Sequence, residues 1–275
     1  MPSNNPAFGR GFARSGMGQQ SAGWSGQPQQ YGAPGQYGAP AQFDPYAAPS
    51  PYGTTATRYM TMDDVVTKTG LSFLVTVIAA AAIWAIPGYS AVGLALPAAL
   101  IGMVLGLVIS FKQIANPAAT LAYAAVEGVF LGGISEVFDL RWPGIVMQAV
   151  IGTFGVFAGM LVVYKTGAIR VTPKFTRWLM GALIGVLVLM IANGISYIFT
   201  PNGLGLRSGG TLAIVFSLVV IGVAAFSLLL DFDMADEAIR RGAPAKFAWY
   251  IAFGLLVTVV WLYLEILRLL SYLRE

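Results

Sequence analysis

The sequence predicts an all-α membrane protein, a bundle of seven transmembrane helices preceded by a disordered N-terminal tail, and three observations lead to this fold class. Of the 275 residues, 57% are hydrophobic and only 10% are charged, whereas soluble domains carry about a quarter charged residues. The mean hydropathy is +0.72. From Gly70 onward the apolar residues form long runs, which is typical of polytopic helical membrane proteins.

The N-terminal tail, residues 1–57, is rich in Gly, Pro, Gln, Ser, Ala and Tyr and contains no long apolar run. Because this composition buries too little apolar surface to offset the entropy of ordering, we expect disorder, and we divide the chain into domains 1–57 and 58–275. The composition of the tail favours an inert tether, with a weak interaction segment as the alternative. It has no apolar h-region, so we expect the first membrane helix to act as an uncleaved insertion signal.

Seven hydrophobic runs follow the tail, and a capping box formed by Thr61 and Asp64 precedes the first of them. The runs are 70–86, 91–111, 118–138, 144–164, 178–199, 211–230 and 247–270. Each is close to the ~20 residues that a helix needs to cross ~30 Å of lipid. They are too long for barrel strands and lack the alternation of such strands. A six-span protein with a re-entrant last run is the alternative.

Lysine and arginine are distributed unevenly between the two sides of such a bundle. With seven spans, one side holds the tail and the loops after the second, fourth and sixth helices. That side has twelve basic residues: Arg10, Arg14, Arg58, Lys68, Lys112, Lys165, Arg170, Lys174, Arg177, Arg240, Arg241 and Lys246. The other side has four: Arg141, Arg207, Arg268 and Arg274. We therefore expect a multi-pass protein of the plasma membrane with its N-terminus in the cytoplasm.

Three pairs of glycines, each with a spacing of four residues, indicate where helices pack closely. They are Gly102 and Gly106, Gly155 and Gly159, and Gly181 and Gly185. Such pairs let two backbones approach where no hydrophobic force drives helices together. We expect a compact monomeric bundle, with oligomerisation through one of these faces as the alternative.

The chain has no cysteine and no histidine. This excludes disulfides, zinc–thiolate sites, haem–histidine ligation and nucleophiles activated by histidine. The Gly-x-Gly-Asp motif of intramembrane aspartyl proteases is also missing from the sequence, so we expect neither an enzyme nor a cofactor. The net charge of +4 fits basic cytoplasmic loops better than a nucleic-acid site, so we expect no nucleic-acid partner. Cation-linked or proton-linked chemistry must therefore use carboxylates.

Carboxylates within the hydrophobic runs are the candidate functional groups, because an ionisable side chain in a span is costly unless it is paired or hydrated. Glu127 lies in the middle of the third run, where a functional role and a hydrogen bond to a neighbouring helix are equally good explanations. Asp231 and Asp233 close the sixth run, where hydropathy alone predicts a solvated end. Glu265 in the seventh run has the spacing for an i,i+3 pair with Arg268.

Four segments resemble the Bax inhibitor/YccA family, and the sequence looks like an actinobacterial-type member of it. The segments are Val-Ile-Ser-Phe-Lys at 108–112, Ala-Tyr-Ala-Ala-Val-Glu-Gly at 122–128, Phe-Ser-Leu-Leu-Leu-Asp-Phe-Asp at 226–233 and Leu-Tyr-Leu-Glu-Ile at 262–266. The resemblance covers residues 60–275 and rests on helix count and several short motifs. It implies a seven-helix bundle in which two carboxylates form a pH-responsive latch over a cation leak path.

By motif, Asp233 matches the first latch carboxylate, Glu265 the second, and Lys112 is the nearest candidate for the basic partner that the resemblance implies. Two features depart from the family pattern. The second carboxylate is Glu rather than Asp, and it follows Asp233 by 32 residues, about two helical turns more than in the family. If the sixth and seventh helices meet near Gly242, the two carboxylates are offset by roughly 21 Å along antiparallel helices. Direct contact then requires a long extension before the seventh helix.

The resemblance favours a pH-responsive cation leak channel or transporter, with Ca²⁺ or H⁺ as the ion, because hard cations prefer oxygen ligands. The expected residues of the ion path or pH latch are Asp233, Glu265, Glu127, Asp231 and Lys112; no metal ligands are assigned. The alternative is a non-transporting regulator that binds a membrane protease or quality-control partner. In both cases we expect the lipid bilayer to surround the helices as their partner.

Overall fold

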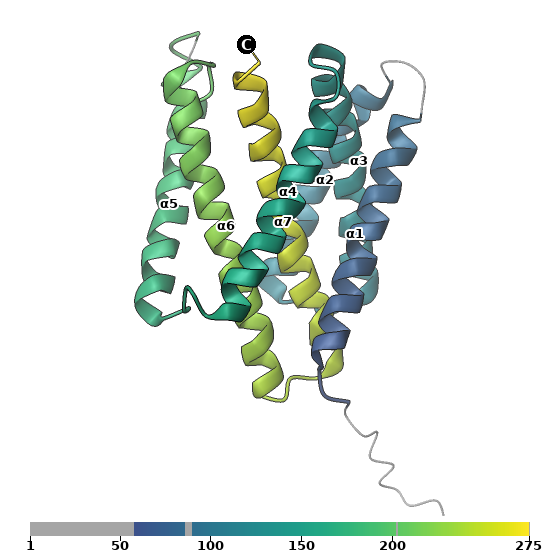
Figure 1. The fold of residues 1–275 in the computed structure, drawn as a ribbon. Helices are drawn as coiled ribbons and strands as arrows, with labels where there is room; N and C mark the ends of the chain where they lie inside the picture. The colour runs from purple at the N-terminus through teal and green to yellow at the C-terminus, as the bar shows by residue number, and fades with distance from the viewer. Residues whose placement is uncertain (1–57, 86–89, 202, 275) are drawn as a thin grey trace, which may run out of the picture. The chain divides into compact units, whose positions relative to one another are not determined.

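The computed structural model describes residues 58–85, 90–201 and 203–274, so the prediction of a disordered tail over 1–57 lies outside the described residues. Seven α-helices and one short 3₁₀ helix make up the described chain (Figure 1). They are α1 (Met62–Trp84), α2 (Ser90–Lys112), α3 (Pro117–Arg141), α4 (Ile145–Thr166), α5 (Pro173–Ser196), α6 (Thr211–Arg240), η1 (Ala245–Phe247) and α7 (Ala248–Tyr272). The predicted all-α class is confirmed, and the seven α-helices are all long and apolar enough to cross a membrane.

The start of α1 and the end of α6 extend furthest beyond the hydrophobic runs. Helix α1 begins at Met62, because Thr61 and Asp64 form the predicted capping box and start the helix eight residues before the apolar run. Helix α6 continues through the acidic residues to Arg240 and is 30 residues long, about 45 Å at 1.5 Å per residue. A helix of that length extends beyond ~30 Å of hydrocarbon, and hydropathy does not detect its polar end.

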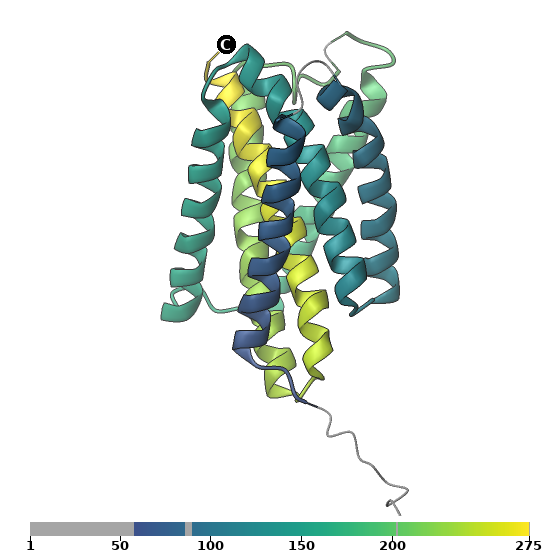
Figure 2. The same cartoon turned by 90° about the vertical axis from the view of Figure 1, so that its right-hand side faces the viewer.

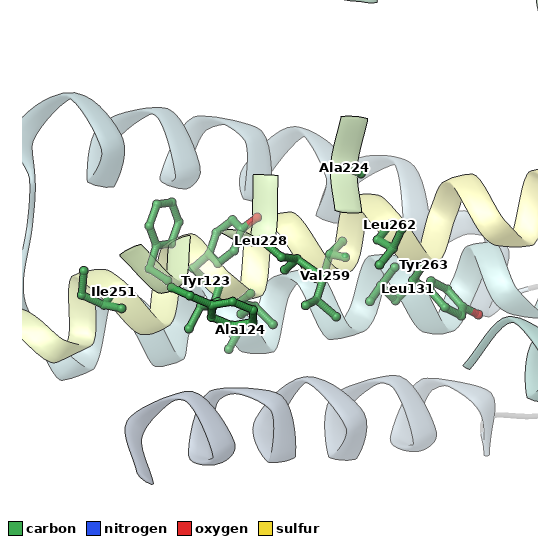
Figure 3. Packing of buried hydrophobic residues seen from close by; sticks show 14 of the residues in the cluster. Tyr123, Ala124, Leu131, Ala224, Leu228, Ile251, Val259, Leu262 and Tyr263 are labelled. Carbon is green, nitrogen blue, oxygen red and sulfur yellow. The ribbon is translucent and has the colours of Figure 1, made fainter. Parts of the chain in front are cut away.

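Helix α7 lies at the centre of the bundle and is the most buried of the seven helices within the described chain. Figure 3 shows its side chains packed against those of α3 and α6. The labelled residues of this core are Tyr123, Ala124 and Leu131 of α3, Ala224 and Leu228 of α6, and Ile251, Val259, Leu262 and Tyr263 of α7. A hydrogen bond of 2.6 Å joins the hydroxyls of Ser135 and Tyr263 across the α3–α7 interface. In lipid, such close packing and interhelical hydrogen bonds hold helices together.

The closest helix contact lies between α1 and α3, where glycines of α3 touch the backbone of α1. A Cβ atom at Gly132 would lie 2.7 Å from the carbonyl oxygen of Ala80, and one at Gly128 would collide with the carbonyl oxygen of Thr76. This pair is not among the three glycine pairs that were predicted to pack. Its spacing is the same as that of the pairs that were chosen, so the spacing alone does not identify the face that meets a neighbour.

Of the three glycine pairs that were predicted to pack, one does. Gly102 and Gly106 lie against side chains of α3. The other two pairs, on α4 and α5, have nothing within 4 Å of a Cβ built at either glycine, so the prediction is wrong for packing within this chain. A small residue permits close approach but supplies no attraction, and α4 and α5 turn these glycines away from their neighbours.

The start of α1 is hydrogen-bonded to the turn between α6 and α7. Helices α6 and α7 themselves lie side by side in Figure 2. The amide of Met60 donates to the carbonyl oxygen of Ala243 at 2.8 Å, and the amide of Ala245 donates to that of Arg58 at 2.8 Å. The Lys68 ammonium also donates to the carbonyl oxygen of Ala245. The turn begins at Arg241, as the sequence analysis assumed when it placed the meeting of the two helices near Gly242.

Candidate functional site

The acidic end of α6 presents its carboxylates to different parts of the bundle. Asp231 and Asp233 are two positions apart, which is about 200° of rotation on an α-helix. Asp231 lines a cavity with Gly254 and Thr258 of α7, whereas Asp233 lines a separate cavity that α1 and α4 share. The prediction that hydropathy gave for this end, a uniformly solvated cluster, is therefore wrong for Asp231.

Asp231 lies in a cavity of about 220 Å³ between α2, α6 and α7. Its Oδ2 atom is buried and has no hydrogen-bond partner among the described residues. Two hydroxyl side chains, Ser110 of α2 and Thr258 of α7, line the same cavity. The site therefore offers oxygen atoms from three helices, and one of these atoms is unsatisfied.

Glu127 lies in an adjoining cavity of about 300 Å³ between α2, α3 and α7. Its side chain is 9% exposed, and Gly102 makes room for it: a Cβ there would lie 2.8 Å from Oε2 of Glu127. Ser110, Phe253 and Val257 line both cavities. The two cavities are thus neighbours that share a wall, and each contains one carboxylate.

Glu265 is 1% exposed and is surrounded by cationic and polar groups. Its Oε2 accepts hydrogen bonds from Arg268 at 3.1 Å and from Arg207 at 3.4 Å. Its Oε1 lies 3.5 Å from the Ser217 hydroxyl of α6. The predicted i,i+3 pair with Arg268 is confirmed, and a second arginine completes the cluster.

The structure does not bring Asp233 and Glu265 together. Glu265 contacts α6 at Ser217, and sixteen residues of one helix separate Ser217 from Asp233, which is about 24 Å. No long extension precedes α7, because only η1 and a short turn join it to α6. Lys112, the last residue of α2, is exposed and has no ion pair among the residues that the structure describes.

Arg207 is the residue of this site that sequence reasoning missed. It belongs to the loop between α5 and α6, and its position in the sequence indicates only a basic residue on one side of the membrane. Its side chain is 16% exposed, and its guanidinium lies between Glu265 and the Met190 sulfur, with the Nη2 atom 2.9 Å from that sulfur. No sequence signal pointed to Arg207, because Arg268 already supplied a cationic partner for Glu265.

Comparison with known proteins agrees with this architecture. The family model described as Bax inhibitor 1 like matches residues 5–275. The chain belongs to this family. An uncharacterized protein of Chlamydia muridarum (strain MoPn / Nigg) is 31% identical over 81 residues, which is 30% of this chain and 34% of the relative. This Bax inhibitor 1-like protein therefore spans about a third of the length of that curated relative, and its actinobacterial character stays a prediction.

Proposed function

We propose that this Bax inhibitor 1-like membrane protein is a pH-responsive leak path for cations rather than an enzyme, with Ca²⁺ as the first candidate, and that ions pass Asp231 and Glu127. The observation that carries the proposal is the pair of adjoining cavities between α2, α3, α6 and α7, each with one carboxylate. In this proposal an ion moves between the two carboxylates past Ser110, which lines both cavities.

The chemistry of the two cavities supports a hard cation. Their polar groups are carboxylate and hydroxyl oxygens, including the side chains of Ser110, Tyr123 and Thr258, and oxygen ligands suit Ca²⁺. Among the described residues, no three acidic or other metal-binding side chains gather into one site. A cation would therefore meet one carboxylate at a time, and conduction requires binding weak enough for release.

The same carboxylates supply a reason for pH dependence in a chain without histidine. Protonation removes the negative charge that compensates a cation in a site poor in water. We therefore expect flux to fall as the pH is lowered through the range in which the two carboxyls titrate. The excess of lysine and arginine on the side of the N-terminal tail supports a cytoplasmic N-terminus, and we propose the plasma membrane as the location.

The test is Ca²⁺ entry into lipid vesicles that contain the purified protein and a calcium dye, measured at stepped pH. Asp231→Asn and Glu127→Gln each remove one charge from the path, so we expect either variant to slow entry at least tenfold and to flatten the pH profile. Glu237→Gln is the matched control on α6, because Glu237 is paired with Arg241 at 2.7 Å and lies outside both cavities.

Two results would contradict the proposal. The first is wild-type flux in both path variants, which would make the two carboxylates structural. The second is loss of flux in Asp233→Asn together with normal flux in Asp231→Asn, which would move the path to the other face of α6. No flux from the wild type at any pH would remove the leak function itself.

A further inference from the structure

A third cavity, larger than the two of the cation path, lies on the opposite face of α6. It has a volume of about 770 Å³ and is bounded by α1, α4, α6 and the loop between α4 and α5. Cavities of 300–1,000 Å³ that are mostly apolar, with a few convergent polar groups, are the usual form of a small-molecule site. In Figure 1 part of α7 is visible between α1 and α4.

One end of this cavity is apolar and aromatic. Ring centroids lie 6.4 Å apart for Phe73 and Phe157, 5.6 Å for Phe157 and Phe232, and 5.7 Å for Phe232 and Tyr164. These rings come from α1, α4 and α6 and form a continuous aromatic wall. Such a wall suits a hydrocarbon chain.

The other end of the cavity carries charges of both signs. Asp233 and Asp236 of α6 are half-buried, and Asp236 accepts a hydrogen bond of 2.8 Å from the Tyr164 hydroxyl. Lys165 and Arg170 line the same end and are exposed. The cavity therefore presents carboxylates for a cation and exposed cations for an anion within one site.

A buried hydroxyl on the wall of the cavity lacks a partner. Thr69 of α1 is 8% exposed, and its Oγ1 makes no hydrogen bond to any described residue. A buried hydroxyl without a hydrogen bond is unfavourable. A polar atom of a bound molecule would satisfy it.

We propose that this cavity binds a glycerophospholipid with an ammonium-bearing zwitterionic headgroup, such as phosphatidylethanolamine, through its headgroup and one acyl chain. Each observed feature then has a partner. The aromatic wall contacts the acyl chain, Thr69 donates to an ester oxygen, Asp233 and Asp236 accept from the ammonium, and Lys165 and Arg170 face the phosphate. An anionic lipid without an ammonium group would leave the two half-buried carboxylates unpaired beside its phosphate.

The inference goes beyond the proposed cation path, because Asp231 and Asp233 lie about 200° apart on α6 and line separate cavities. Lipid binding could fail while flux persists, and flux could fail while lipid binding persists. The two proposals are therefore tested separately.

The experiment is native mass spectrometry of the full chain in detergent, titrated with phosphatidylethanolamine or phosphatidylglycerol of identical acyl chains. We expect the wild type to bind phosphatidylethanolamine at least tenfold more tightly. Asp233→Asn removes a charge-assisted hydrogen bond, so we expect about tenfold weaker binding of phosphatidylethanolamine and little change for phosphatidylglycerol. Glu237→Gln, near Asp233 on α6 but outside the cavity, should bind as the wild type does.

A second variant tests the location without removing a charge. Gly70 lines the cavity, and a Cβ built there has nothing within 4 Å, so Gly70→Trp fills the space without displacing backbone. We expect this variant to elute and melt like the wild type but to lose bound phosphatidylethanolamine. Equal affinity for the two lipids, or full lipid binding by Gly70→Trp, would overturn the proposal.

Discussion

The ion cluster around Glu265 allows a sharp test of what holds the α5–α6 loop onto the bundle. Arg207→Met keeps the apolar stem of the side chain but removes the guanidinium that joins the loop to α7. Glu265 would then remain buried, at 1% exposure, with Arg268 as its only ion-pair partner among the described residues. A buried carboxylate that loses part of its compensation must destabilise the folded bundle.

The expected size follows from burial. Removing one partner from a buried ion pair costs about 3–5 kcal/mol, and the remaining bond to Arg268 places this variant near 3 kcal/mol. Arg268→Met likewise leaves the buried Glu265 with a single arginine, so its cost should also be about 3 kcal/mol. Replacing both members of the pair, as in Arg207→Met with Glu265→Leu, removes the uncompensated charge and should return stability to within about 1 kcal/mol of the wild type.

The assay is reversible unfolding in mixed micelles with increasing SDS, followed by far-UV circular dichroism and analysed as a double-mutant cycle. We expect the effects of the substitutions at residues 207 and 265 on the free energy of unfolding to be strongly coupled, and we expect the double variant to recover stability. This expectation would be refuted if Arg207→Met unfolded like the wild type, or if the double variant were as unstable as the sum of the two single variants.

Three further outcomes are expected. Glu127→Gln should slow cation flux in vesicles. Glu136→Gln on the same helix should not, because Glu136 lines neither the Asp231 cavity nor the Glu127 cavity. Equal flux in the two variants would make Glu127 structural. Gly128→Ala should lower the free energy of unfolding by about 1–3 kcal/mol through overpacking against α1. Gly155→Ala should not, because a Cβ at Gly155 has open space around it. Equal melting temperatures for the two variants would contradict the close α1–α3 contact. Deletion of residues 1–57 should leave flux unchanged, and loss of a co-purified membrane protease after this deletion would instead favour a tail-mediated regulator.

The sequence predicts the helices of this protein well because lipid leaves few choices. A run of about 20 apolar residues must hydrogen-bond its own backbone, and in a bilayer only a helix or a closed barrel does so. The same argument fails at the ends of α1 and α6, where polar residues continue a helix beyond the hydrocarbon. The capping box at Thr61 predicts the first extension correctly, and Gly242, which follows the basic last turn of α6 and has a φ of 68°, marks where the second extension ends.

The candidate site was harder to predict, because partners in a bundle come from distant parts of the chain. The sequence identified the buried carboxylates through their position in apolar runs. It could not identify Arg207, which reaches Glu265 across 58 residues, or Ser110, which lines both small cavities from α2. These contacts depend on the conformation of the loops and on the rotation of each helix about its own axis. A hydropathy profile gives no information about either.

Helix rotation also explains how one acidic stretch can serve two different environments. Adjacent positions on α6 are about 100° apart, so Asp231 is directed towards α7 and Asp233 towards the space between α1 and α4. Glu265 meanwhile has two arginines within 3.4 Å, so its charge is already compensated within the bundle. A latch between Asp233 and Glu265 would have to break this cluster and close about 24 Å along α6. Asp231 and Glu127 have no ion pair among the described residues and lie in adjoining cavities, so they are better placed than Glu265 to exchange a proton or a metal cation without dismantling the fold.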